Sequence, residues 1–285
     1  MKLVSYRHHG VRGVGKVDEV SRRVVPLDDE HGHPLTDMLA LIRAGSDSVS
    51  PSIMREPMAP VDLHLLAPIP RPARNIFCIG KNYPQRMQAW AHGEQGSADG
   101  RMPSLSTKVP ECVIGDGDII QYPQGLTAAL DYAAELAVVI GRGGRGIRRA
   151  DALDHVFGYT IINDVTARDL RPPGQGAFLG KSFDTFCPMG PCIVTADALN
   201  AQAFELRCYV NGELRQQGNT DEMILDIPTL IETLSAGMTL YPGDIIATGS
   251  PRGVGAEWDP PRFLQTGDEI RIQISGIGTL SNTVF

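Results

Sequence analysis

The chain has 285 residues, of which 42% are hydrophobic and 21% are charged, and its formal net charge is −7. These proportions are typical of one or two globular domains and exclude a disordered chain, while the acidic balance argues against a nucleic-acid partner, which would need clustered Lys and Arg. No apolar run approaches the roughly 18 residues of a membrane span, and the N-terminus lacks the apolar core of a signal peptide. We therefore expect a cytoplasmic protein with no membrane partner.

The cysteines argue against a disulfide framework and against a zinc site. Their number is odd, and no two of them show Cys-x-x-Cys spacing. We expect reduced thiols with a structural role. They are Cys78, Cys112, Cys187, Cys192 and Cys208.

The first part of the chain has the pattern of a small α/β domain. Short β-like runs such as residues 2–7 are followed by apolar periodicity that predicts a helix near residues 35–44. Residues 66–73 then hold three prolines, which disfavour both helix and central strand and favour a connector. We place the boundary here, which gives domains 1–68 and 69–285.

Beyond residue 112 the pattern is β-rich, because short apolar runs alternate with glycine-containing turns. The sequence V-N-G-E at residues 210–213 predicts a hairpin turn. Helices are expected at 150–156 and 223–236. Upstream, residues 84–92 predict a short helix, and the small, polar residues 95–101 predict a loop that could cover a site. The expected fold class is α+β and β-rich.

Residues 141–146, G-R-G-G-R-G, match the G-x-G-x-x-G dinucleotide fingerprint, with Asp164 about 20 residues further on. The helix predicted after them has only about two turns, and the chain lacks the alternating β and α units of a nucleotide-binding fold. We therefore interpret the segment as a glycine-rich turn and expect no nucleotide cofactor.

Acidic side chains gather near two predicted strands. Asp131 and Glu135 lie an even number of residues apart and so share one face of an extended strand, and Asp164 ends the apolar run YTIIN. Carboxylates buried together would need a cation or a shared proton, whereas surface or salt-bridged acids would need neither. Residue spacing alone leaves both interpretations open.

Two further segments carry candidate polar groups. Lys181 and Asp184 could form a simple ion pair. The turn within residues 242–255 follows a predicted strand and could offer backbone N–H groups to a carboxylate, or it could be only a tight β-turn.

Five motifs, taken in order along the chain, carry the functional interpretation. They are LDYAAELAVVIGRGG, HVFGYTIINDVTARDL, GKSFDTFCPMGP, VNGELRQQGNT and TLYPGDIIATGSPRGVG. Together they resemble the fumarylacetoacetate hydrolase superfamily from about Arg74 to Phe285. The resemblance implies a mixed β-roll catalytic domain beside the small N-terminal domain, and a homodimer. It also implies a Mg or Mn ion, held by three carboxylates, that chelates a 2-oxo acid or its enol.

The resemblance also implies roles for individual residues. Lys181 would neutralise the oxyanion that develops on the substrate, and Glu135 and Asp164 would be metal ligands. The residues implied to bind substrate are Tyr83, Arg168, Asp184, Thr248, Gly249 and Ser250.

The metal motif departs from the family pattern. The superfamily carries Glu-x-Glu on the strand, but its first glutamate position is Ala133 here. Asp131 lies on the same face, about 6.6 Å further along an ideal strand, and could replace the missing ligand only through a strand shift or a bridging water. The implied metal site is therefore incomplete.

The motif for water activation departs as well. The superfamily has a His followed three residues later by a Glu, where this chain has Arg86 and Ala89. An arginine cannot act as a general base at neutral pH, so we expect Arg86 to bind a substrate carboxylate. His92 and Glu94, just downstream, could supply an alternative base.

Three functions stay open. The first is an enzyme acting on a 2-oxo or 1,3-dicarbonyl acid by C–C cleavage, decarboxylation or keto–enol isomerisation, with lyase or isomerase chemistry favoured because moving a proton on an enol needs no activated water. The second is a metal-independent member that catalyses a cyclisation or tautomerisation. The third is a non-catalytic binding subunit.

Overall fold

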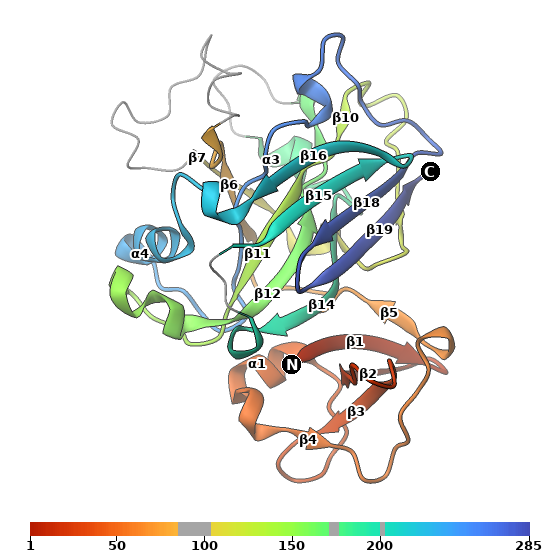
Figure 1. Ribbon diagram of the computed structural model, residues 1–285, viewed down its shortest axis with the longest axis vertical. Helices are drawn as coiled ribbons and strands as arrows, with labels where there is room; N and C mark the ends of the chain where they lie inside the picture. Colours follow the sequence, from red (N-terminus) through yellow and green to blue (C-terminus); the bar gives the residue numbers. More distant parts are fainter. Residues whose placement is uncertain (85–103, 171–176, 200–202) are drawn as a thin grey trace.

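The computed structural model describes residues 1–84, 104–170, 177–199 and 203–285. The β-rich α+β fold expected from the sequence is confirmed (Figure 1). Most strands belong to a 12-stranded mixed sheet, and a five-stranded sheet packs beside it. Within the described ranges no helix is long and apolar enough to cross a membrane.

The large sheet runs through the whole length of the molecule. Its main path is β4-β3-β2-β1-β14-β12-β11-β17-β6-β7, with β5 beside β1 and β8 beside β14. The strands are β1 Lys2–His8, β2 Val11–Val17, β3 Val24–Asp28, β4 Ser50–Pro51, β5 His64–Leu66, β6 Ile76–Gly80, β7 Ser104–Lys108, β8 Val113–Ile114, β11 Ala134–Ile140, β12 Val156–Asn163, β14 Cys187–Thr195 and β17 Ile245–Ala247.

The smaller sheets complete the fold. The five-stranded sheet has the order β16-β15-β18-β19-β9, and β10 pairs with β13. Their strands are β9 Ile119–Ile120, β10 Leu130–Asp131, β13 Thr166–Ala167, β15 Glu205–Val210, β16 Glu213–Asn219, β18 Glu269–Ile274 and β19 Gly278–Val284.

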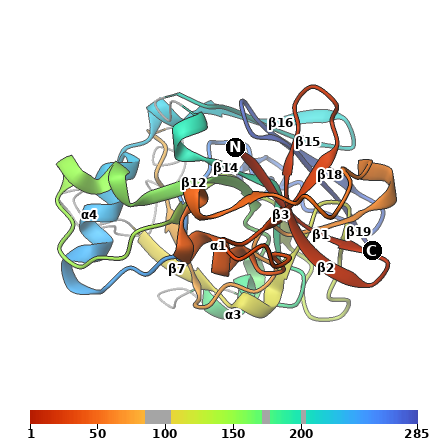
Figure 2. The same ribbon diagram turned by 90° about the horizontal axis from the view of Figure 1, so that it is seen from below.

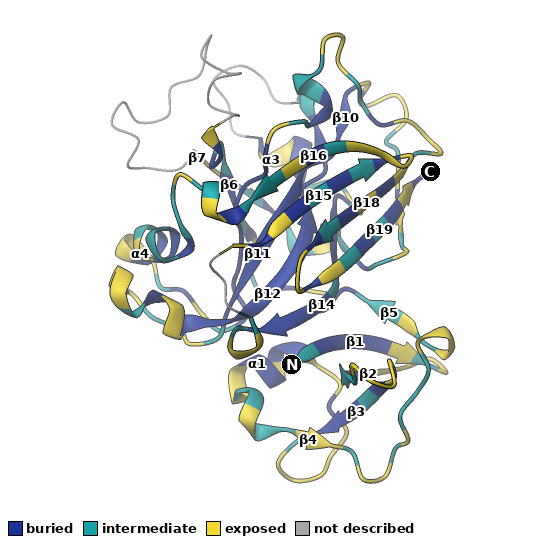
Figure 3. Cartoon of the chain, in the orientation of Figure 1, coloured by how far each residue is buried: buried dark blue, intermediate teal, exposed yellow. Residues whose placement is uncertain are grey.

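The core is centred on β11 and β12. Every residue of these two strands is buried (Figure 3). Predominantly apolar runs of this kind are typical of strands covered on both faces. The two strands pair antiparallel, with Glu135 opposite Ile162, so the ends that carry the acidic residues lie together.

The N-terminal residues form the lower part of the molecule in Figure 1, and β1, β2, β3 and helix α1 (Met38–Ala44) lie in front when it is seen from below (Figure 2). This part is joined to the rest through the sheet, because Lys2 and Leu3 of β1 pair with Val194 and Ile193 of β14. The division at residue 68 stays a prediction.

Local structure follows the sequence in most places. Asn211 and Gly212 adopt positive φ angles of 52° and 78°, which makes the predicted hairpin turn between β15 and β16. The helix expected at 35–44 is α1, which begins at Met38 because the Asp37 side chain caps it. All five cysteines are buried, unpaired thiols, as expected.

Two helix predictions need correction. The segment predicted as a helix at 150–156 is a 3-10 helix, Arg149–His155. Helix α4 (Ile227–Gly237) begins four residues later than predicted, because Asp226 accepts a hydrogen bond from Thr229 N and Pro228 occupies the first turn. The helix predicted at 84–92 and the loop at 95–101 lie outside the described residues, apart from Pro84.

The glycine-rich segment 141–146 is packed as a turn. Its amides are used by the protein itself, since Gly141 N donates to His155 O, Gly144 N to Leu240 O and Gly146 N to Ser235 O. This is the glycine-rich turn that we inferred from the sequence.

Candidate functional site

The candidate site lies at one end of β11 and β12. Asp164 directly follows β12, and its N–H donates to Ala133 O over 2.8 Å, which extends the ladder by one pair beyond Ala134 and Asn163. Opposite residues in a ladder share a face, and so do residues two apart on one strand. Ala133, Glu135 and Asp164 therefore share one face.

Asp164 is held by two buried lysines. Lys181 Nζ donates to Asp164 Oδ2 and to Thr166 Oγ1, the latter over 3.1 Å. Lys181 ends the short helix α3 (Phe178–Lys181), which packs closely on β13 because a Cβ at Gly180 would lie only 2.6 Å from Ala167 O. The glycine thus brings Lys181 to Asp164.

Lys108 is the second cation, and its side chain is fully buried. Its Nζ donates to the carbonyl oxygens of Val165, Lys181 and Phe186, each over 2.7 Å. Nζ also lies 3.0 Å from Asp164 Oδ1, but that oxygen accepts no hydrogen bond, because the three protons of the ammonium point to the three carbonyls. The contact is an ion pair only.

The two lysines keep Asp164 ionised. Burial alone would raise the pKa of the carboxyl, but the ammonium groups of Lys181 and Lys108 outweigh it and hold the pKa well below its usual range. For Lys108, burial acts to lower the pKa and the Asp164 charge more than offsets it, so the pKa is raised. Asp164 and Lys108 are therefore both charged at neutral pH.

This cluster predicts a loss of stability in acid. Because the pKa of Asp164 is lower in the folded chain than in the unfolded chain, its contribution is complete above about pH 5 and is lost as the pH falls below about 4. Replacing Asp164 with Asn should flatten the fall of unfolding free energy between about pH 5 and 3 by up to about 1.4 kcal/mol per pH unit, the value for one proton. Urea unfolding across this range measures it, and equal slopes in both proteins would contradict the assignment.

Glu135 is fixed by the loop that follows β17. Its Oε2 accepts a hydrogen bond from Gly249 N over 3.0 Å. Gly249 has a φ of 95°, and a Cβ there would lie 2.9 Å from the Cβ of Asn82, so glycine is needed at this position. Thr248 donates both its N–H and its hydroxyl to Leu136 O. In the turn predicted to bind a substrate carboxylate, the N–H groups of Gly249 and Thr248 and the Thr248 hydroxyl thus already donate to protein oxygens.

Tyr83 adds an unsatisfied hydroxyl. Its side chain is fully buried, and its hydroxyl has no hydrogen-bond partner. Burial, together with the nearby negative charge of Glu135, raises the pKa of Tyr83 well above its ordinary value, so the phenol stays protonated and can donate. Because a buried donor without a partner costs about 1–3 kcal/mol, its position favours a ligand oxygen.

Asp131 has another role than the one predicted. Its Oδ1 accepts from Gly255 N over 2.6 Å and Tyr132 N over 3.0 Å, and its Oδ2 accepts from Arg168 Nε over 2.8 Å and Ala256 N over 3.2 Å. In the part of the chain that the structure describes, no three His, Cys, Asp or Glu side chains form a group that could hold a metal ion. Asp131 therefore fixes a loop rather than completing a metal site with Glu135 and Asp164.

The remaining predicted residues divide into three sets. Arg168 is engaged by Asp131. Asp184 is exposed and is not the ion partner of Lys181, which pairs with Asp164 instead. Arg86, His92 and Glu94 lie outside the described residues. Lys108 was missed, because a single lysine at the end of a short strand gives no sequence signal of burial.

The implied metal is not matched by this donor set. Asp164 pairs with two ammonium groups, Lys108 and Lys181, so its negative charge is already compensated by the protein. Ala133, where the resemblance implies a third carboxylate, offers only a methyl group. A three-carboxylate site for Mg or Mn does not fit the described residues.

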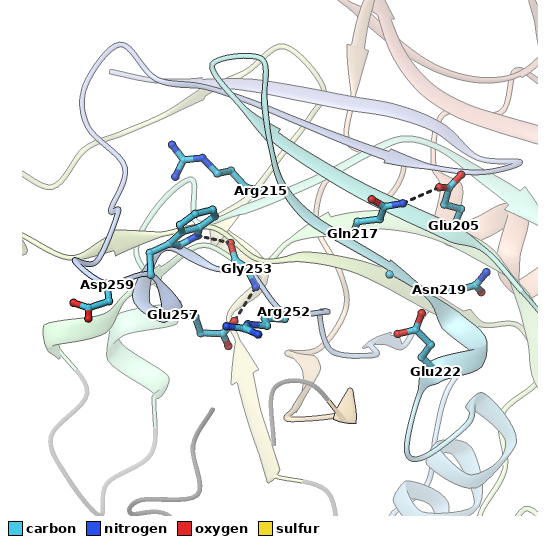
Figure 4. A pocket seen from close by; sticks show the side chains of 11 residues that line it. Glu205, Arg215, Gln217, Asn219, Glu222, Arg252, Gly253, Glu257 and Asp259 are labelled. Atoms are coloured by element: carbon cyan, nitrogen blue, oxygen red, sulfur yellow. Dashed lines mark hydrogen bonds between the residues drawn. The ribbon is translucent and has the colours of Figure 1, made fainter. Parts of the chain in front are cut away.

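A separate groove lies between β16 and residues 252–259 (Figure 4). It has a volume of about 1050 Å³, and charged side chains such as Arg215, Glu222 and Arg252 line it. One wall touches the site, because a Cβ at Gly218 would lie 2.7 Å from Pro251 and 3.8 Å from the Tyr83 ring. The groove is not lined by the Asp164 cluster, so it borders the site without containing it.

Comparison with known proteins gives relatives over most of the chain. The family model for the fumarylacetoacetate (FAA) hydrolase C-terminal domain matches residues 75–285. Oxaloacetate tautomerase YisK of Bacillus subtilis is 52% identical over 228 residues, which are 80% of this chain and 74% of the relative.

Two solved structures are similar over the full length of this chain. A fumarylacetoacetate hydrolase from Exiguobacterium antarcticum has a TM-score of 0.83 and 38% identity and is covered over 99% of its length. A 2-hydroxyhepta-2,4-diene-1,7-dioate isomerase from Mycobacterium marinum has a TM-score of 0.78 and 31% identity and is covered over 98%.

Proposed function

Since the chain belongs to the fumarylacetoacetate hydrolase family and is an enzyme of that superfamily, we propose that it catalyses keto–enol tautomerisation of a small 2-oxo acid. Oxaloacetate is the first substrate to test, because the Bacillus subtilis relative is named as an oxaloacetate tautomerase. The Mycobacterium marinum structure is also named as an isomerase of an enolisable acid.

The observation that carries the proposal is the buried Lys181–Asp164 pair next to Glu135. Tautomerisation moves a proton between a carbon atom and the oxygen of the neighbouring carbonyl, and negative charge develops on that oxygen. Lys181 Nζ uses two of its three protons on Asp164 and Thr166. The third can be donated to the substrate oxygen, where a fixed positive charge in a buried site stabilises an oxyanion strongly.

Glu135 is the proposed proton carrier among the described residues. It lies on the same face as Asp164, and the Gly249 amide fixes its orientation. In the keto-to-enol direction, a carboxylate placed near the substrate carbon can accept the proton that leaves the carbon while Lys181 donates a proton to the carbonyl oxygen. Exchange with solvent then removes the proton from Glu135 and restores the one on Lys181. Tyr83, with its protonated and unpaired hydroxyl, is proposed to donate to a substrate oxygen.

Hydrolysis is the second candidate, favoured by the name of the Exiguobacterium antarcticum structure. C–C hydrolysis needs a water molecule activated by a general base. The two positions that carry the activating His and Glu in the superfamily are Arg86 and Ala89 in this chain, and neither can remove a proton from water at neutral pH. Tautomerisation needs no such water and is therefore the stronger proposal.

The proposal predicts that the purified protein speeds the loss of enol absorbance from oxaloacetate in proportion to enzyme concentration, without releasing pyruvate. Lactate dehydrogenase with NADH in a parallel reaction detects decarboxylation, and an acylpyruvate tests C–C hydrolysis. Pyruvate formed as fast as the enol disappears would replace tautomerisation by decarboxylation. Turnover of the acylpyruvate alone would favour hydrolysis.

A further inference from the structure

We infer that this chain works without a divalent metal ion, and that the Lys181 ammonium, with Lys108 behind Asp164, supplies the positive charge that a metal would place against the substrate. The catalytic half of this inference rests on the proposed function. The metal-binding half does not, because it can be measured without turnover.

The missing ligand is the first step. Ala133 lies on the face that carries Glu135 and Asp164, since its carbonyl accepts the Asp164 N–H. It is 3% exposed, so its methyl group is packed inside the protein rather than facing open solvent. A hard cation such as Mg²⁺ takes oxygen ligands, and this position offers none from its side chain.

Asp131 cannot fill the gap. Four N–H donors, from Gly255, Ala256, Tyr132 and Arg168, point at its two oxygens. Turning this carboxylate toward a metal would leave the largely buried Arg168 guanidinium and two loop amides without their acceptor. Removing one partner of a buried ion pair is strongly unfavourable, because it leaves the other charge uncompensated.

The charge balance points the same way. Lys108 and Lys181 both pair with Asp164, and the formal charges of these three groups and Glu135 sum to zero. All four residues are at least nine-tenths buried. A dication added to this neutral set would leave two uncompensated positive charges in a buried site, which is costly. A third carboxylate would reduce that excess to one, and this is the carboxylate that Ala133 lacks.

Lys108 and Lys181 have different roles in supplying the positive charge in place of a metal ion. Lys108 uses all three protons on backbone carbonyls, so it acts as a positioning residue whose charge offsets Asp164. Lys181 uses two protons and keeps one for a substrate oxygen. The ammonium that contacts the substrate is therefore Lys181. Because Asp164 is shared with Lys108, it does not compensate the full charge of Lys181.

The test starts with metal binding. Wild-type protein is treated with a chelator and dialysed against about 100 μM Mn²⁺, and bound Mn²⁺ is measured by electron paramagnetic resonance. We expect a Kd of about 1 mM or weaker, so less than about one tenth of an ion should be bound per chain. Its melting temperature should not change with Mg²⁺, and EDTA should not change its tautomerase rate. One tightly bound Mn²⁺ per chain, with turnover abolished by EDTA, would overturn the inference and leave the proposed function standing.

A gain of binding is the matched experiment. Ala133→Glu should bind about one Mn²⁺ per chain and gain a few degrees of melting temperature with the ion. Ala133→Gln has the same size but no charge and should do neither. If the glutamate variant folds and still binds no Mn²⁺, Ala133 is not the missing ligand position, and the explanation of the metal-free site by this residue is wrong.

The two proposals fail separately. A wild-type protein that neither binds Mn²⁺ nor tautomerises any oxo acid would refute the proposed function while the metal-free assignment holds. Should neither Ala133 variant fold, the wild-type Mn²⁺ and EDTA measurements still decide the inference by themselves.

Discussion

Replacing Lys181 with Gln is expected to lower kcat/KM for tautomerisation by about 10²- to 10³-fold, the usual effect of removing one group that stabilises a developing oxyanion. Gln keeps an N–H that can bond to Asp164 Oδ2, so the local packing is largely preserved, but it carries no charge for the substrate oxygen. Steady-state loss of enol absorbance from oxaloacetate measures the effect. Most of the loss should appear in kcat, because the charge develops only in the transition state.

The control for Lys181→Gln is Lys2→Met. Lys2 lies in β1 and forms a partly exposed ion pair with Glu19 at 3.5 Å. It does not belong to the Asp164 cluster, so its loss should leave kcat/KM unchanged. Circular dichroism and a thermal melt of each variant separate lost chemistry from lost folding. A Lys181→Gln protein that stays folded and keeps wild-type turnover would remove Lys181 from the reaction.

The fold could be predicted from the sequence where one pattern has one physical solution. The runs that became β11 and β12 are mostly apolar and bounded by glycine or polar residues, and a strand covered on both faces is their usual outcome. The Asn211–Gly212 turn left little choice either, since its positive φ angles suit these two residues. Residues 150–156 were less decided, because seven residues are too few to distinguish an α-helix from a 3-10 helix by periodicity.

The site was predictable only in part. Glu135 and Asp164 could be placed together only through the resemblance to the superfamily, because residue spacing alone left their arrangement open. The partner of Lys181 could not, since Asp184 is three residues away in sequence whereas Asp164 is 17 away and is reached only through the packing of α3 on β13. Spacing reports local neighbours, and ion pairs between elements depend on how those elements pack.

Asp131 and Lys108 show that the sequence can both suggest a site residue wrongly and miss one. Asp131 has the right residue type and strand face for a ligand, but the loop at Gly255 and Ala256 folds back onto it and uses its oxygens. Lys108 gives no signal in the sequence, yet β7 carries its ammonium into the interior, where three carbonyls from separate segments meet. Both outcomes depend on contacts between residues far apart in the chain.

Replacing Lys108 with Met is expected to lower the free energy of unfolding by about 3–5 kcal/mol, the usual result of removing one partner of a buried ion pair. Met matches the length and much of the volume of the lysine side chain, so the effect reports lost interactions rather than a large cavity. The carbonyls of Val165, Lys181 and Phe186 would lose their donor, and a buried acceptor without a partner costs about 1–3 kcal/mol. Urea unfolding at neutral pH measures the change.

The charge part of that loss can be isolated with Asp164→Asn. In Lys108→Met the ionised Asp164 keeps only Lys181, whereas in the double variant no carboxylate is left uncompensated. The double variant should therefore be more stable than the sum of the two single effects predicts, by about 1–3 kcal/mol, the range found for residues in contact. Lys2→Met again serves as control and should cost less than about 1 kcal/mol, because exposed ion pairs contribute little. A Lys108→Met protein within about 1 kcal/mol of wild type would mean that the buried ammonium does not stabilise the site, and that Asp164 depends on Lys181 alone.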